Sequence, residues 1–272
     1  MTRKKLILHG ALFILTFLST YFVAGIWYAV PLMTILLCHE MGHYVMSRFY
    51  GVEATLPFFI PFPFSPFGTF GAIIKMKGWI PSRRALFDIG AGGPLAGLVL
   101  TLPAIYFGLK MSTIVPISAV RGEGLVLGDS LLFKGLEYLA LGPLPKGHDV
   151  VLHPLAYAGW VGLFVTALNL LPIGQLDGGH VVYALLGPKS LKVYRVAILL
   201  FALYALFFNP GWVILVVLLF FFGLKHPSPL DDETPLDRGR MILGIGMLLI
   251  FFSSFMPAPF PELAKELGGL MG

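Results

Sequence analysis

The sequence predicts an all-α polytopic membrane protein with six or seven transmembrane helices and a membrane-embedded β-hairpin after the second helix. Hydrophobic residues make up 57% of the 272 residues, Asp, Glu, Lys and Arg together only 12%, and the mean hydropathy is +0.85. A soluble domain carries about 25% charged residues, so this composition indicates a chain that lies in a bilayer. The length allows these spans and little else. We therefore expect a single transmembrane domain over 1–272, with a core at about 29–188 and peripheral helices at 190–256.

The first span is predicted between the basic N-terminal residues and about Tyr28. Arg3, Lys4 and Lys5 precede an apolar run of more than 20 residues. This run is too long for the hydrophobic region of a signal peptide, and no clear small-residue cleavage site follows a short segment. It is long enough to cross a bilayer, so we expect an uncleaved helix. A second span follows at about 31–49.

The remaining spans are less regular. A third is predicted at about 86–109, with Asp88 favouring its helix N-terminus, and a fourth at about 152–171. The fourth breaks at Pro172 and Gly174 and resumes at 178–186, because proline interrupts a helix. Residues 196–224 contain no charged residue but are cut by Asn209-Pro210-Gly211, which predicts two short antiparallel helices. The piece at 211–224 is short for a complete crossing. The last span is expected at about 241–256.

The distribution of basic residues predicts the orientation. If the N-terminus lies in the cytoplasm, 14 of the 19 Lys and Arg residues fall on that side, as the positive-inside rule requires. The five on the other side are Lys110, Arg121, Lys134, Lys146 and Lys265. We therefore expect a multi-pass protein of the cell membrane with a cytoplasmic N-terminus. The net charge of +5 is a topology signal and gives no reason to expect a nucleic-acid partner.

Ionisable side chains appear together inside the second predicted span. Residues 39–43 read His-Glu-Met-Gly-His, after a stretch from Leu6 to Cys38 that contains no acidic residue, Lys or Arg. Ionisable residues within a membrane span are rare and usually functional. Residues four apart share one face of a helix, so His39 and His43 point the same way. Two such histidines with Glu40 beside them indicate the zinc site of a metallohydrolase. Two histidines satisfied by hydrogen bonds in a helical bundle are the alternative.

A catalytic zinc needs a third protein ligand, and Asp177 is the candidate. In the predicted topology it lies at the same membrane depth as the histidines. It follows the helix break at Pro172 and Gly174, and irregular backbone at membrane depth is tolerated only where it is buried or faces a watery cavity. A helix cap at the restart is the alternative role for Asp177. His180, three residues later, is either a second-layer partner of the site or a polar lining of the water path. The single Cys38 excludes an internal disulfide and a multi-cysteine metal site.

These motifs resemble the site-2 protease family of intramembrane zinc metalloproteases. The resemblance rests on His39-Glu40-Met41-Gly42-His43, on the Asn-Leu-Leu-Pro at 169–172 and on the Leu-Asp-Gly at 176–178. It implies one zinc ion held by His39, His43 and Asp177, with Glu40 as the catalytic acid/base and Asn169 near the scissile carbonyl. It also implies regulated intramembrane proteolysis, in which transmembrane segments of single-span proteins are cleaved within the bilayer. The chain resembles the minimal forms without a PDZ or CBS domain.

The residues fit such a mechanism. A zinc ion lowers the pKa of water and polarises a carbonyl. Glu40 is next to a ligand and can move a proton between water and the leaving amine. Asn169 offers a neutral donor to the developing oxyanion, or else a hydrogen bond between helices. Gly93 and Gly97 form a small-residue face that permits close helix packing.

The segment 56–77 is predicted to handle the substrate. Its prolines forbid a regular helix, and its phenylalanines keep it at membrane depth. Residues 69–77 alternate as a strand, whose edge could bind an unwound substrate by β-augmentation. The family pattern places Gly68, Thr69, Phe70 and Gly71 in the substrate-binding set. The alternative is a hairpin that only plugs the bundle.

Three other functions are the alternatives to an intramembrane zinc protease of this family. A metal transporter would use intramembrane His and Asp residues, but it predicts several ligand sets along a path, and the sequence has one cluster. An inactive family member acting as a chaperone conflicts with the presence of every motif residue. A membrane protease of the prenyl-protein type also uses His-Glu-x-x-His, but its acid would occur in a different context from Leu-Asp-Gly.

Overall fold

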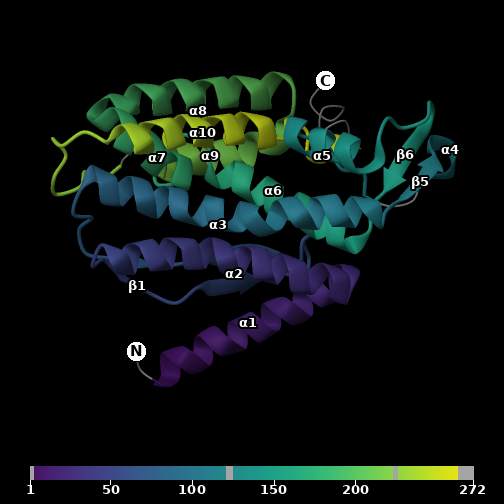
Figure 1. Ribbon diagram of the computed structural model, residues 1–272, viewed down its shortest axis with the longest axis horizontal. Coiled ribbons are helices and arrows are strands. Elements are labelled where there is room, and N and C mark those ends of the chain that lie inside the picture. Colours follow the sequence, from purple (N-terminus) through teal and green to yellow (C-terminus); the bar gives the residue numbers. More distant parts are fainter. Residues whose placement is uncertain (1–2, 121–124, 223–225, 263–272) are drawn as a thin grey trace. The chain divides into compact units, whose positions relative to one another are not determined.

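The computed structural model describes residues 3–120, 125–222 and 226–262, and helices predominate in it (Figure 1). The chain divides into two compact units. The first contains Met1–Gly78, Gly92–Gly122 and Leu132–Thr166, and the second contains Trp79–Ala91, Glu123–Leu131 and Ala167–Gly272. Helices α3 (Arg83–Lys110) and α6 (Pro154–Asn169) each have residues in both units. Arg121, Lys225, Lys265 and the end of the predicted 211–224 helix lie outside the described residues.

Two long helices begin the first unit. Helix α1 (Arg3–Ala24) and helix α2 (Ile26–Phe49) are separated by Gly25, whose φ of +74° suits glycine. Helix α2 begins earlier than predicted, so Pro31 lies inside it. Helix α2 buries Tyr28, Leu32, His39 and His43, spaced by multiples of about one helical turn. The apolar and the metal-binding side chains of α2 therefore share one buried face.

Short antiparallel strand pairs complete the first unit. Strand β1 (Glu53–Ala54) pairs with β4 (Met76–Lys77), and β2 (Phe58–Pro61) pairs with β3 (Thr69–Ile73). The predicted hairpin is thus present, but the continuous strand expected over 69–77 is wrong, because β3 ends at Ile73 and β4 pairs elsewhere. A third pair joins β5 (Thr113–Pro116) to β6 (His148–Val151), with α4 (Ile117–Val120) and α5 (Leu131–Leu141) between them in the chain. The sequence predicted a single hairpin in a helical fold, so the β1–β4 and β5–β6 pairs are additions to that prediction.

The second unit is helical. Helix α6 ends at Asn169 and α7 (Asp177–Leu186) begins after a bend, which confirms the predicted break. The 3-10 turn η1 (Gly187–Lys189) leads into α8 (Ser190–Phe207). The break near Asn209 is also confirmed: its side-chain Oδ1 accepts from the Gly211 amide at 3.1 Å. There η2 (Pro210–Trp212) and α9 (Val213–Phe222) follow, before α10 (Arg238–Ser254).

The role predicted for Asp88 is wrong. Its carboxylate accepts two hydrogen bonds from the Arg240 guanidinium, at 2.8 and 2.6 Å, which join α3 to α10. The sequence could not show this pairing, because the two residues are 152 positions apart. Asp88 is therefore part of an ion pair between helices rather than a charge at a helix N-terminus.

Three candidate spans are long and apolar enough to cross a membrane in the described part of the chain: α1, α3 and the segment Asp177–Phe207. Helices Pro154–Asn169 and Pro210–Phe221 are apolar but shorter. The described part of the chain is therefore mostly helical and holds three candidate membrane-spanning helices. The six or seven spans, and the depth of the β2–β3 hairpin in the bilayer, stay predictions.

Candidate metal centre

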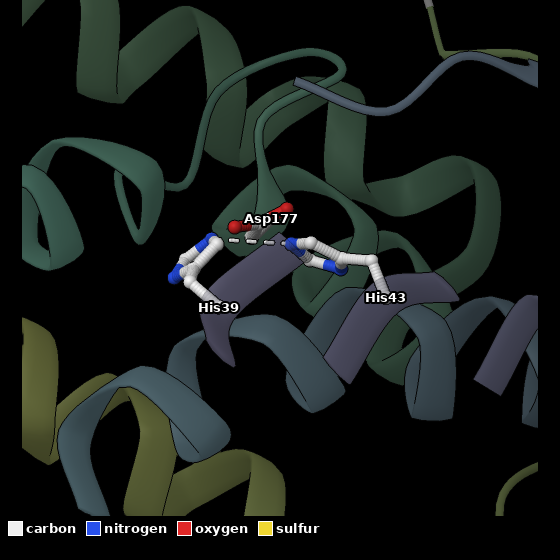
Figure 2. A group of neighbouring side chains, drawn as sticks. All are labelled: His39, His43 and Asp177. Carbon is white, nitrogen blue, oxygen red and sulfur yellow. Dashed lines mark hydrogen bonds between the residues drawn. The ribbon is translucent and has the colours of Figure 1, made fainter. Parts of the chain in front are cut away.

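Helix α2 supplies two histidines to the centre. His39 and His43 lie one helical turn apart, so their rings leave the same face, and their Nε2 atoms are 3.2 Å apart (Figure 2). Only 4% of His39 and 7% of His43 is exposed. Glu40, next to His39 on the same helix, is also buried. A carboxylate and two imidazoles that are buried this far need a compensating partner.

Helix α7 supplies a carboxylate. Asp177 is the first residue of this helix, and the N-cap position is Leu176, which makes no side-chain cap. One ligand atom from each of His39, His43 and Asp177 lies within 4.8 Å of the others (Figure 2). The bend before α7 requires glycine, because a methyl group at Gly178 or Gly179 would overlap the carbonyl oxygens of Leu170 and Gly174.

The donor set fits zinc. Catalytic zinc sites use three protein ligands and keep one position open, and two imidazole nitrogens with a carboxylate oxygen are a known combination. His39, His43 and Asp177 could therefore form a zinc site. Cys38 does not belong to this group.

Helix α3 approaches the histidines through glycines. A methyl group at Gly93 would overlap Nε2 of His43, and one at Gly97 would lie 3.3 Å from Nδ1 of His39. A methyl group at Gly42 of α2 would overlap the Gly92 carbonyl oxygen. The predicted small-residue face of α3 is thus confirmed as a close contact with α2. Both imidazole rings lie against bare backbone, so their positions depend on the absence of side chains on α3.

We expect Gly93→Ala to weaken zinc binding by at least about tenfold, because the added methyl group would displace the His43 ring. Alanine normally favours a helix over glycine by roughly 0.5–1 kcal/mol. A loss would therefore come from displacement of His43 and not from helix propensity. Metal analysis of the purified variant checks this outcome. Gly10→Ala is the matched control, since nothing lies within 4 Å of a methyl group at that helical position. Full zinc occupancy in Gly93→Ala would contradict the packing argument.

The other predicted site residues occupy three places in the chain. Glu40 is on α2 between the two histidines, and Asn169 is the last residue of α6, directly before the bend that leads to Asp177. Gly68 closes the turn before β3, with φ at +74°. Thr69, Phe70 and Gly71 open that strand, where Thr69 and Gly71 are buried and Phe70 is 68% exposed. The three predicted metal ligands are thus brought together, while the residues predicted to bind the substrate lie in the β2–β3 hairpin.

The structure contains a histidine pair that the sequence did not predict, between His180 of α7 and His226. His180 Nδ1 lies 2.7 Å from Nε2 of His226, and the His226 ring stacks on Tyr183 at 4.4 Å. The Tyr183 hydroxyl donates to Asp232 at 2.9 Å. Burial lowers the pKa of His226 below its ordinary value. The segment between α9 and α10 is thereby fastened to the helix that begins with Asp177. His226 is 46 residues from His180 with no shared motif, so no sequence signal indicated the pair.

Comparisons with known proteins agree with this centre. The family model described as Peptidase family M50 matches residues 27–208. The probable zinc metalloprotease EGY2, chloroplastic, of Oryza sativa subsp. indica is 34% identical over 245 residues, covering 87% of this chain and 43% of that protein. EGY2 of Arabidopsis thaliana, with the same description, is 32% identical over 225 residues, covering 82% and 40%. EGY1 of Arabidopsis thaliana, also described as a probable chloroplastic zinc metalloprotease, is 32% identical over 257 residues, covering 88% and 44%. The chain spans less than half the length of these relatives.

Proposed function

The chain belongs to peptidase family M50, the site-2 protease family, and on this premise we propose that it is a zinc-dependent endopeptidase that cleaves transmembrane segments of single-span proteins within the bilayer. The observation that carries the proposal is the convergence of His39, His43 and Asp177 on one point, with Glu40 buried beside the histidines. The membrane-spanning helices support a substrate that is itself embedded in the membrane. Regulated intramembrane proteolysis is the process that such an activity would serve.

The proposed mechanism divides the chemistry among five side chains and one ion. His39, His43 and Asp177 would hold a zinc ion, which when bound would polarise a carbonyl as a Lewis acid and lower the pKa of water. The Glu40 carboxylate takes a proton from the attacking water while the new carbon–oxygen bond forms. It returns that proton to the leaving amine as the peptide carbon–nitrogen bond breaks. The Asn169 side-chain amide donates a hydrogen bond to the developing oxyanion.

Strand β3 is the proposed binding edge for the substrate. A helical transmembrane segment hides its peptide bonds in its own hydrogen bonds, so it must be extended before it can be cut. Among the described strands, β3 pairs only with β2, which leaves its second edge for an added strand. We assign Gly68, Thr69, Phe70 and Gly71 to this contact. Buried Gly71 keeps the edge open to a close backbone approach, and exposed Phe70 offers an apolar surface.

We propose one metalloprotease domain over 1–272, with its catalytic core at about 29–188 and helices of 190–256 at its periphery. The distribution of Lys and Arg supports an N-terminus on the side that carries 14 of the 19 basic residues. The three relatives are chloroplastic by name. The comparisons therefore do not support the cell membrane as the membrane in question.

Metal removal tests the proposal. We expect purified protein in liposomes to cut a single-span reporter inside its transmembrane segment, at a Gly-Pro interruption that unwinds the helix. A chelator should abolish the cut, and added zinc should restore it, because the site needs its ion. Mass spectrometry of the products locates the bond. Cleavage only in the aqueous flanks of the reporter, or cleavage that survives chelation, would refute an intramembrane zinc protease.

A further inference from the structure

Three hydroxyl groups fasten the turn of the β2–β3 hairpin to three helices of the first unit. The backbone carbonyl oxygens of the consecutive residues Pro66, Phe67 and Gly68 each accept a hydrogen bond from one of these hydroxyls. Their donors and distances are Tyr157 Oη of α6 at 2.8 Å, Tyr28 Oη of α2 at 2.9 Å and Ser19 Oγ of α1 at 2.5 Å. Each of the three carbonyls of this turn thus accepts a hydrogen bond from a side chain of the protein.

Packing reinforces these hydrogen bonds. The rings of Tyr28 and Tyr157 stack with centroids 4.9 Å apart, and Trp160 stacks on Tyr157 in turn. Phe67 lies against Trp160 and Phe164 of the same stack. Tyr28 and Trp160 are completely buried. Tyrosines in such a stack have little rotamer freedom, so their hydroxyls are fixed in place.

The contact with α1 leaves the turn no room to slide. A methyl group at Gly68 would lie 2.8 Å from the Thr20 Cα and 2.9 Å from the Ser19 carbonyl oxygen. The Gly68 carbonyl also accepts from the Phe62 amide at 3.1 Å, which closes the turn on itself. Ser19 is 6% exposed, so its bond to Gly68 is shielded from solvent. The turn is therefore held from three sides.

One of these attachments lies on α2, the helix that carries His39 and His43. Tyr28 and His39 share the buried face of α2, and their eleven-residue spacing at ~1.5 Å per residue corresponds to about 16 Å. Strand β3 starts directly after the fastened turn and contacts α2. Its end leads to β4, which pairs with β1 close to the far end of α2. The strand therefore runs along α2 from Tyr28 toward the histidines, and its five residues cover about 17 Å.

We propose that Ser19, Tyr28 and Tyr157 are positioning residues that set the register of strand β3 against His39 and His43, and so decide which peptide bond of an extended substrate is cut. The proposal rests on the function proposed above. The position of a substrate strand paired with β3 is set by the position of β3. A shift of one residue in the pairing would turn every substrate side chain to the opposite face of the sheet, so a shift that preserves the faces is two residues. A fixed turn therefore gives a single cleavage position, and a loosened turn gives several.

The double variant Tyr28→Phe/Tyr157→Phe tests this. It keeps the ring stack and removes the two tyrosine hydroxyls that donate to the turn, so two of the three hydrogen bonds that hold the turn are lost. With the single-span reporter in liposomes, we expect wild type to cut at one bond. The variant should add products displaced by two residues and lose about tenfold in kcat/KM at the original bond. Its zinc content should match wild type. Amide hydrogen exchange over 62–71 should be faster in the variant, a readout that does not depend on cleavage.

Tyr21→Phe is the matched control, because Tyr21 on α1 is 45% exposed and lies outside the turn contacts. One unchanged cleavage position in the double variant, alongside faster exchange, would overturn the register proposal and leave the protease proposal intact. A wild-type protein that cuts nothing would instead overturn the proposed function. If the double variant does not fold, Ser19→Ala removes the bond to Gly68 with a smaller change. Unchanged exchange and an unchanged cleavage position in Ser19→Ala would overturn the proposal as well.

Discussion

Glu40→Gln is expected to lower kcat for reporter cleavage by at least about 10²-fold while the zinc stays bound. General acid–base catalysis contributes about 10²–10⁴ to a rate, and an amide can neither take the proton from water nor return it to the amine. The substitution nearly conserves volume in a buried position, so the fold and the ligand histidines should be retained. Product formation and zinc content are measured on the same preparation.

Glu53→Gln is the matched control for this substitution. Glu53 lies in β1 and is exposed, so its carboxylate has no part in the proposed chemistry. If Glu40→Gln cleaved the reporter at the wild-type rate, Glu40 would not be the acid/base. If Glu40→Gln lost its zinc, the residue would belong to the metal site instead of acting beside it. Reporter cleavage at equal rates by wild type and Glu40→Gln would instead favour a role as a transporter or a chaperone.

Asp177→Ala is expected to weaken zinc binding by more than about 10²-fold and to abolish cleavage. Loss of a second-layer partner of a zinc ligand already costs about 10–100-fold in affinity, and a direct ligand contributes more. The two histidines that remain would be left 3.2 Å apart without the carboxylate that compensates them. Competition with a zinc chelator of known affinity gives the dissociation constant. Asp149→Ala, at an exposed position in β6, should bind zinc as wild type does.

The ligand set and the irregular elements near it were predictable from sequence for local reasons. His39 and His43 lie one helical turn apart, and helix geometry alone places them on one face. Pro172 and Gly174 mark the bend before Asp177, because proline and glycine interrupt helices by their backbone properties. The break at Asn209-Pro210-Gly211 follows from the same rule. Each of these signals is contained within a few neighbouring residues.

Contacts between distant segments were not predictable. Asp88 pairs with Arg240, and His180 pairs with His226, through contacts that no short motif encodes. The β5–β6 pair was missed because the two strands are separated by more than 30 residues, and their composition does not stand out in an apolar chain. The length of β3 was overestimated for a related reason. Alternation continued past Ile73, but strand pairing with β2 did not.

The proposed activity depends most on His39, His43 and Asp177 binding one metal ion together. Zinc K-edge X-ray absorption of the purified protein tests this directly, in wild type and in Asp177→Ala reloaded with excess zinc. We expect one zinc per chain in wild type, a spectrum with imidazole ligands and no sulfur, and a changed coordination in the variant. A sulfur ligand from Cys38, or the same spectrum with and without the Asp177 carboxylate, would contradict it.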